Sequence, residues 1–229
     1  MPKKAKQSQP EYVLHYWPSK GRAELIRLTL VVCGLEWKEA YVTDEGEVET
    51  KKKSGTAESP FGQWPLLVED GEVLCQTLAI VKHLGRQHGL YGASAKNRME
   101  DYVCDAFLAG VDALRSKYTD MKYVHGNTPE AKEKFEKGHL NPESKTTMCG
   151  GAHLSYLEGF LERSKSDWIA GGKDMSVADI ALYDLFGELQ AVFGDKLAET
   201  YPKCAALHKK IAELPAIAAY LQSDKRHKD

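Results

Sequence analysis

The spacing of apolar residues changes in character near residue 90, and this change divides the chain into two parts. Before that point, short apolar and β-branched runs that favour strands alternate with runs at helical spacing. After it, apolar residues recur every three or four positions and strand signals nearly vanish. The pattern predicts a mixed region followed by an all-helical one.

The first part reads as strand, helix, strand, a charged loop, a hairpin and a second helix. Residues 18–21 are typical of a turn, and Asp70-Gly71 is typical of a hairpin turn. The charged segment 44–59 predicts a mobile loop with a ragged helix. A parallel pair of strands next to an antiparallel hairpin predicts a small mixed sheet with helices on both faces. The predicted strands cover residues 12–17, 37–42, 66–68 and 72–75, and the predicted helices cover residues 23–32 and 77–88.

In the second part, helical periodicity predicts one long helix from Met99 to Tyr118 and another around Leu154 to Leu161. Ser176-Val-Ala-Asp179 is a variant of the capping box and predicts the start of a third long helix. Short final helices are expected over 207–221, with a break at Pro215. The predicted organisation is a disordered tail (1–11), a mixed α+β domain (12–89), a linker (90–95) and an all-helical domain (96–229).

Composition adds few constraints to this picture. The 229 residues are 42% apolar and 28% charged, as in an ordinary soluble globular protein with a sufficient core. The net charge of −2 gives no field that would attract nucleic acid or an anionic membrane. The basic start MPKKAK lacks an apolar h-region and so does not resemble a secretory signal, and no apolar run approaches the roughly 20 residues that span a bilayer.

The cysteines and histidines indicate neither cross-links nor metal. The five cysteines are far apart and include no C-x-x-C, and the eight histidines show no ligand spacing. We therefore expect no metal and a reducing, cytoplasmic setting. The cysteines are Cys33, Cys75, Cys104, Cys149 and Cys204.

The stretch SPFGQWPLLVEDGEVLCQT, from Ser59 to Thr77, has polar corners but no obvious nucleophile. Taken alone, the Trp64-Pro65 step favours the plain start of a strand. Taken alone, Thr77 fits the N-cap of the helix that follows.

Five motifs in order resemble the cytosolic glutathione transferases of the tyrosine-dependent group, near the pi and sigma classes. The resemblance runs from about Tyr12 to Leu221, and it implies a thioredoxin-like N-terminal domain, glutathione as substrate and a homodimer. The motifs are YWPSKGRAELIR, FGQWPLLVEDG, CQTLAIVKHLGRQHGLYG, DALRSKY and GGKDMSVADIALYDL.

The resemblance assigns a glutathione site. It implies a cis bond before Pro65, with the main chain of Trp64 facing outward to pair with the cysteine of glutathione like an added strand. Thr77, at a helix N-terminus, would hold the γ-glutamyl carboxylate with its hydroxyl and N–H. The implied glutathione-binding residues are Tyr16, Arg22, Lys53, Gln63, Trp64, Pro65, Gln76, Thr77 and Asp112.

Tyr16 is the catalytic residue that the resemblance implies, with Arg22 adding positive potential and orienting it. A thiol with a pKa near 8.5 is only about 3% thiolate at pH 7, and the thiolate is the nucleophile. Lowering the thiol pKa by about 2 units takes roughly 2.7 kcal/mol, which a hydrogen bond from a phenol can largely supply. A strand tyrosine is otherwise commonly a core residue, and Tyr12 lies too early in the strand to reach the turn.

Two positions depart from the family pattern. In the longer loop after the second strand, Glu47 stands where the family often has a tryptophan that holds the glycine carboxylate, which leaves Lys53, from the lysine run, as the candidate. The partner subunit would supply an acidic residue to the glutathione amine. Asp112 fits this role, but Ala113 occupies the neighbouring slot, so Asp105 on the same helix face is the alternative. Both acids could equally be ordinary exposed helix charges.

Phe61 matches an aromatic residue that inserts into the partner subunit in related classes, although local packing over the sheet would also explain it. The resemblance also implies an electrophile pocket between the domains, apolar through its aromatic residues and more polar through Arg115 and Ser19. Core packing is the alternative for Trp17. The implied pocket residues are Trp17, Ser19, Arg115, Tyr118 and Thr119.

Several functions remain open at this point. The first is a glutathione transferase that acts on small apolar electrophiles, and the same fold also serves glutathione-dependent isomerases such as prostaglandin D synthase. A non-catalytic relative, crystallin-like or ligandin-like, would tolerate losses in the glutathione site. A thiol-redox enzyme would need a cysteine where Pro18, Ser19 and Lys20 stand, and a serine-dependent mechanism through Ser19 fits less well than Tyr16.

Overall fold

The computed structural model describes residues 10–91, 98–144 and 151–227, without the side chains of Thr50, Lys51 and Arg98. The chain forms two compact units, which we call unit 1 (Met1–Leu84 with Ala216–Asp229) and unit 2 (Gly85–Pro215). Most of the predicted tail and linker, and Cys149, lie outside the described residues.

Unit 1 contains a four-stranded mixed sheet. The strands β1 (Tyr12–Tyr16), β2 (Trp37–Tyr41), β3 (Leu66–Glu69) and β4 (Glu72–Cys75) lie in the order β2-β1-β3-β4. Strand β1 is parallel to β2 and antiparallel to β3, with Leu14 opposite Leu67, and both side chains are fully buried. The hairpin β3–β4 turns at Asp70 and Gly71, which both have positive φ. The predicted mixed sheet is confirmed.

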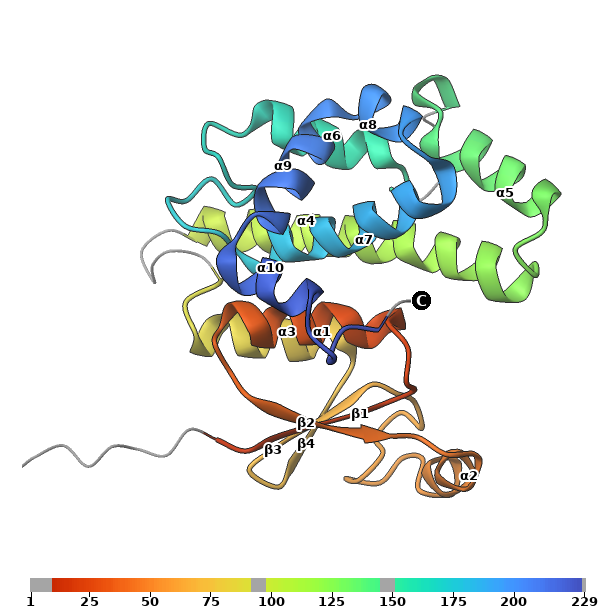
Figure 1. The fold of residues 1–229 in the computed structure, drawn as a ribbon, viewed down its shortest axis with the longest axis vertical. Coiled ribbons are helices and arrows are strands. Elements are labelled where there is room, and N and C mark those ends of the chain that lie inside the picture. The colour runs from red at the N-terminus through yellow and green to blue at the C-terminus, as the bar shows by residue number, and fades with distance from the viewer. Residues whose placement is uncertain (1–9, 92–97, 145–150, 228–229) are drawn as a thin grey trace, which may run out of the picture. The chain divides into compact units, whose positions relative to one another are not determined.

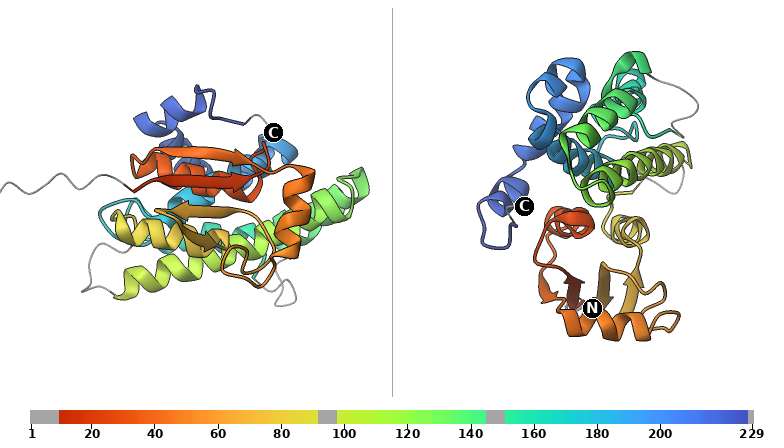
Figure 2. Two further views of the ribbon diagram at one scale, coloured as in Figure 1. Left: turned by 90° about the horizontal axis from the view of Figure 1, so that it is seen from below. Right: turned by 90° about the vertical axis from the view of Figure 1, so that its right-hand side faces the viewer.

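Helices cover both faces of this sheet (Figures 1 and 2). On one face lie α1 (Glu24–Val32) and α3 (Thr77–Gln87), and on the other lies α2 (Asp44–Lys52). Helix α1 is the most deeply placed, since every residue from Glu24 to Leu30 is buried. The segment predicted as a mobile loop with a ragged helix therefore begins with a regular helix, α2.

Unit 2 is all-helical, as the periodicity predicts. Its centre is α7, with eleven buried residues. A helix absent from the prediction, α5, begins at the Thr128 cap, and two π-helical turns, at Asp120–Val124 and Glu136–Leu140, flank it. The helices are α4 (Arg98–Thr119), α5 (Pro129–Phe135), α6 (Leu154–Arg163), α7 (Val177–Phe193), α8 (Lys196–Thr200) and α9 (Pro202–Ala212).

The last helix, α10 (Pro215–Leu221), begins at the proline where the sequence predicts a break. Pro at the first helical position is favoured because that N–H has no intrahelical partner. From Ala216 onward the chain belongs to unit 1, although it follows the helical part in sequence. Within the described ranges, no helix combines the length and the apolar character that crossing a membrane requires.

Candidate functional site

Tyr16 ends β1 and faces the turn that follows it. Its hydroxyl oxygen accepts a hydrogen bond from the backbone N–H of Arg22 at 3.1 Å. The turn comes so close that a Cβ on Gly21 would lie 2.4 Å from this oxygen, and Gly21 has a φ of +40°. A phenol that accepts a backbone N–H in this way can use its own O–H as a donor.

The backbone of Arg22 links Tyr16 to the start of α3. Its N–H donates to Tyr16, and its carbonyl accepts a hydrogen bond from the Thr77 hydroxyl at 3.3 Å. We expected Arg22 to orient Tyr16, and the hydrogen bond from Arg22 to the Tyr16 hydroxyl comes from its main chain. The two predicted residues Tyr16 and Thr77 are therefore joined through a single peptide segment of unit 1.

Gln76 occupies the N-cap position of α3. Its carbonyl accepts the N–H of Ile80 at 3.0 Å, and its φ is +67°. A residue other than glycine in this left-handed region costs of order 1–3 kcal/mol, and such residues cluster at functional sites. The interpretation of Thr77 as the N-cap is therefore wrong by one residue, because Thr77 is the first residue of the helix and its hydroxyl donates to Arg22 instead.

The peptide bond between Trp64 and Pro65 is cis, as the resemblance implies. Strand β3 begins one residue later, at Leu66. Trp64 itself lies in no helix or strand. Within the described part of the chain, neither its N–H nor its C=O makes a backbone hydrogen bond. The rings of Trp64 and Trp17 pack in a T-shaped arrangement, with 5.7 Å between centroids and 73° between planes.

Three further predicted residues of unit 1 are exposed or partly exposed, namely Gln63, Lys53 and Phe61. Gln63 is exposed. Lys53 already holds two carboxylates, Glu58 at 2.7 Å and Glu49 at 3.5 Å, and the hydrogen bond to Glu58 raises the pKa of Lys53. Phe61 is 60% exposed, which is unusual for a large aromatic side chain.

Two predicted pocket residues of unit 2 are buried within that unit. Arg115 pairs with Asp184 at 2.5 Å and with Glu188 at 3.2 Å, and its side chain is only 7% exposed. Tyr118 is also buried, and its ring contacts that of Phe135. Ion pairing accounts for the burial of Arg115, and packing against Phe135 accounts for that of Tyr118.

The other predicted residues of unit 2 lie on α4. Asp112, Asp105 and Thr119 are each partly exposed on this helix.

A buried group of charges in unit 1 was not predicted. Arg27, in the middle of α1, is fully buried and binds Glu39 of β2 through two hydrogen bonds of 2.8 and 3.1 Å. Burial alone would lower the pKa of Arg27, but Glu39 and Glu24 more than compensate and raise it. The available signal was a single arginine inside the apolar run 23–32.

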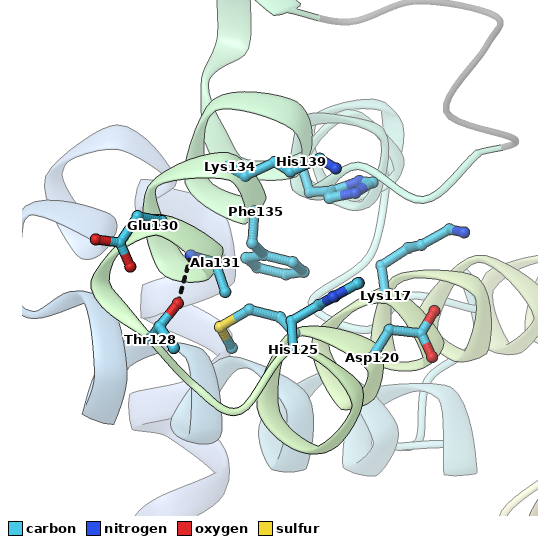
Figure 3. A pocket seen from close by; sticks show the side chains of 10 residues that line it. Lys117, Asp120, His125, Thr128, Glu130, Ala131, Lys134, Phe135 and His139 are labelled. Carbon is cyan, nitrogen blue, oxygen red and sulfur yellow. Dashed lines mark hydrogen bonds between the residues drawn. The ribbon is translucent and has the colours of Figure 1, made fainter.

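Unit 2 also contains a cavity of about 600 Å³ beside the end of α4 (Figure 3). The ring of Phe135 points into it, and Lys117 and Lys134 share its lining with Asp120 and Glu130. Both signs of charge are present, and none of the predicted site residues lines it.

Comparisons with known proteins agree with the motifs. The model of the glutathione S-transferase N-terminal domain matches residues 12–86, and that of the C-terminal domain matches residues 113–224. The chain is 33% identical over 225 residues to glutathione S-transferase P 1 of Xenopus laevis, which covers 96% of this chain and 95% of that protein.

Two solved structures are similar to this one. The glutathione S-transferase of Ascaris lumbricoides matches with a TM-score of 0.73 and 27% identity, over 93% of this chain and 96% of that one. Prostaglandin synthase D of Nilaparvata lugens matches with a TM-score of 0.73 over 93% of this chain and 98% of that one. Its identity is 24%, so this likeness shows the fold alone.

Proposed function

The chain belongs to the glutathione S-transferase family, and from this premise we propose that Tyr16 activates the thiol of glutathione. The enzyme transfers glutathione to electrophiles. Our assignment of Tyr16 makes it a tyrosine-type transferase near the pi and sigma classes. The observation that carries the assignment is the Tyr16 hydroxyl, which accepts the Arg22 N–H and lies against Gly21.

The proposed chemistry needs only a hydrogen bond to sulfur. The thiol of glutathione loses its proton to solvent, and the Tyr16 O–H donates to the thiolate that remains. The thiolate then forms a bond to the electrophilic carbon as the leaving group departs with its electron pair. Because the Arg22 N–H fixes the phenol oxygen, the donor is in position before the charge forms.

The rest of glutathione would lie along residues 63–77. We propose that the main chain of Trp64, ahead of the buried Pro65, pairs with the cysteine residue of glutathione like an added strand. Thr77 and the amides at the start of α3 would hold the γ-glutamyl carboxylate, with Gln63 and Gln76 beside it. Lys53 is the candidate for the glycine carboxylate, and Glu49 and Glu58 would have to release it.

We also propose a cytoplasmic homodimer with domains at 12–89 and 96–229. The exposed ring of Phe61 supports an interface, because a large aromatic side chain is a typical anchor between subunits. Asp112 of the partner subunit, or alternatively the partner subunit's Asp105, would meet the amine of glutathione. The candidates for the electrophile site are Trp17, Ser19, Arg115, Tyr118 and Thr119.

A glutathione-dependent isomerase of the prostaglandin D synthase kind is the second candidate. It is supported by the shared fold with the Nilaparvata lugens protein. Both candidates require the same glutathione residues and differ only in the electrophile. Turnover of an aryl halide compared with turnover of a prostaglandin endoperoxide would distinguish them.

Replacing Gly21 by alanine is expected to lower kcat/KM for conjugation about tenfold, because the new Cβ would displace the Tyr16 hydroxyl. Gly34→Ala is the matched control, since Gly34 also has a positive φ (+67°) but a Cβ there meets nothing within 4 Å. The measurement is glutathione conjugation to 1-chloro-2,4-dinitrobenzene, together with the melting temperature of each variant. Equal activity in the two variants would contradict a role for the contact between Gly21 and Tyr16.

Replacing Phe61 by glutamate is expected to weaken self-association about thirtyfold, because an anchoring aromatic side chain is lost and a charge is buried. The measurement is the molar mass over a dilution series by sedimentation equilibrium. Val48→Glu is the control, since Val48 is similarly exposed (53%) and also lies in unit 1. If both variants associate as the wild type does, Phe61 is no anchor.

A further inference from the structure

We propose that segment 216–227 helps to hold the Tyr16 hydroxyl in place, acting through a buried charge cluster. The charge cluster consists of Arg27, Glu24, Glu39 and Arg226. The proposal rests on the assignment of Tyr16 as the residue that activates glutathione. The members of the cluster are positioning residues, because each acts through the backbone of the turn at residues 19–22.

Arg27 holds the turn at residues 19–22 through hydrogen bonds to its backbone. Its Nη1 donates to the carbonyl oxygen of Ser19 at 2.8 Å, and it lies 3.4 Å from that of Lys20. These carbonyls immediately precede Gly21 and Arg22, which contact Tyr16. A shift of the turn would therefore move the N–H that holds the Tyr16 hydroxyl, and the close approach at Gly21 leaves little room for such a shift.

Two carboxylates hold the guanidinium of Arg27. Glu39 accepts from Nε and Nη2, and the indole N–H of Trp37 donates to the same carboxylate at 2.7 Å. Glu24 lies 3.4 Å from Nη1, the nitrogen that also binds the turn. The side chains of Arg27 and Glu24 are 0% and 2% exposed, so an unbalanced charge would be strongly disfavoured.

Segment 216–227 supplies the fourth charge of the cluster. Arg226 Nη1 lies 3.0 Å from Glu24 Oε1, and the Tyr220 hydroxyl donates to both oxygens of Glu24 at 3.2 and 3.3 Å. Burial, with Glu24 nearby, raises the pKa of Tyr220, which keeps this hydroxyl protonated as a donor. Figure 1 shows α10 and the residues after it beside α1.

The cluster is balanced only when Arg226 is present. Two guanidinium groups then face two carboxylates. Without Arg226, Arg27 would be the one cation still paired with Glu24 among the described ion pairs. Glu24 would then compete more strongly for Nη1 against the carbonyls of Ser19 and Lys20. The turn would be held less firmly, and the Tyr16 hydroxyl with it.

The test is the pH profile of kcat/KM for conjugation by Arg226→Ala. We expect a loss of about tenfold near pH 6.5 and little loss near pH 8.5, where the thiolate forms without help from a phenol. Arg226→Lys keeps the charge and should restore most of the activity at the lower pH. Arg226 is 23% exposed at the side chain, so both variants should fold.

Lys225→Ala is the matched control. Lys225 is the neighbouring cation. It pairs with the exposed Glu36 and lies over the ring of Trp37, but it forms no ion pair with the four charges of the cluster, so the pH profile should not change. An unchanged profile in Arg226→Ala would overturn the proposal. A loss that is equal at every pH and accompanies a lower melting temperature would also overturn it, because it would indicate a structural role alone.

Tyr16→Phe, measured in parallel, separates this proposal from the proposed function. If Tyr16→Phe shifts the profile and Arg226→Ala does not, only the role of the charge cluster fails. If Tyr16→Phe leaves the profile unchanged, the assignment of Tyr16 fails, and the cluster proposal fails with it.

Discussion

Tyr16→Phe is expected to lower kcat/KM for glutathione conjugation about 25-fold at pH 7, and about a hundredfold below about pH 5.5, where the limit is equivalent to about 2.7 kcal/mol of lost stabilisation. The substitution keeps the ring and removes only the O–H that we assign to the thiolate. No other described contact of the proposed site offers a phenol donor at the turn after β1. The substitution should lower activity and leave the stability of the protein almost unchanged, because the ring still packs against Gly21.

The pH dependence identifies the cause of this loss. In the wild type, kcat/KM should rise with a pKa about 2 units below that of free glutathione, whereas in Tyr16→Phe it should rise near the ordinary thiol value. The activity of the two enzymes should therefore converge as the pH approaches 9. The measurement is initial rates of conjugation across this pH range, with the ultraviolet absorbance of the bound thiolate as a second signal.

Tyr12→Phe is the matched control for this experiment. Tyr12 lies at the other end of the same strand. Its hydroxyl donates to the side chain of Glu69, its cross-strand partner on β3, at 3.0 Å. Removing this hydroxyl should lower stability slightly and leave the pH profile unchanged. A normal profile in Tyr16→Phe would instead make Ser19 the next candidate, as the residue of a serine-dependent mechanism.

The sequence predicted the elements that are bounded by clear turn or capping residues. The hairpin was readable because Asp70-Gly71 separates two apolar runs, and the start of α7 was readable from Ser176 and Asp179. Helix α5 was missed because PEAKEKF contains only Ala131 and Phe135 on its apolar face. Its real signal was the cap at Thr128 with Pro129 at the first position.

Side-chain partners were harder to predict, because they come from distant parts of the chain. Arg27 sits in an apolar run that we read only for its periodicity, and Glu39 reaches it only because β1 and β2 pair in parallel. Arg115 was assigned to a pocket through the resemblance. Its carboxylate partners, Asp184 and Glu188, lie on α7, and no local pattern connects them to α4.

Asp179→Ala is expected to destabilise unit 2 by about 3 kcal/mol, the largest stability effect that we predict. Asp179 is fully buried and accepts three hydrogen bonds, from the N–H of Ile169 at 2.9 Å and from the N–H and hydroxyl of Ser176, both at 2.8 Å. Removing the carboxylate leaves the buried Ile169 N–H without its acceptor. It also removes the two hydrogen bonds that join Ser176 to the first turn of α7. Since α7 forms the centre of unit 2, the loss of stability should affect the whole unit.

Burial limits the size of this effect. It raises the pKa of Asp179, while the N–H groups of Ile169 and Ser176 oppose that rise. The carboxylate therefore already carries a desolvation cost that alanine would not have, and the net loss is smaller than three charge-assisted hydrogen bonds would suggest. Ser176→Ala should cost about 1 kcal/mol, because it removes only the hydroxyl donor.

The measurement is unfolding in urea followed by far-ultraviolet circular dichroism, with the melting temperature as a second value. For a chain of this length, about 3 kcal/mol corresponds to a decrease of about 10 °C. Asp174→Ala is the control, since Asp174 is exposed and lies just before the same helix. If the unfolding midpoints of Asp179→Ala and Asp174→Ala coincide, the start of α7 depends on apolar packing alone, and the carboxylate contributes no net stability.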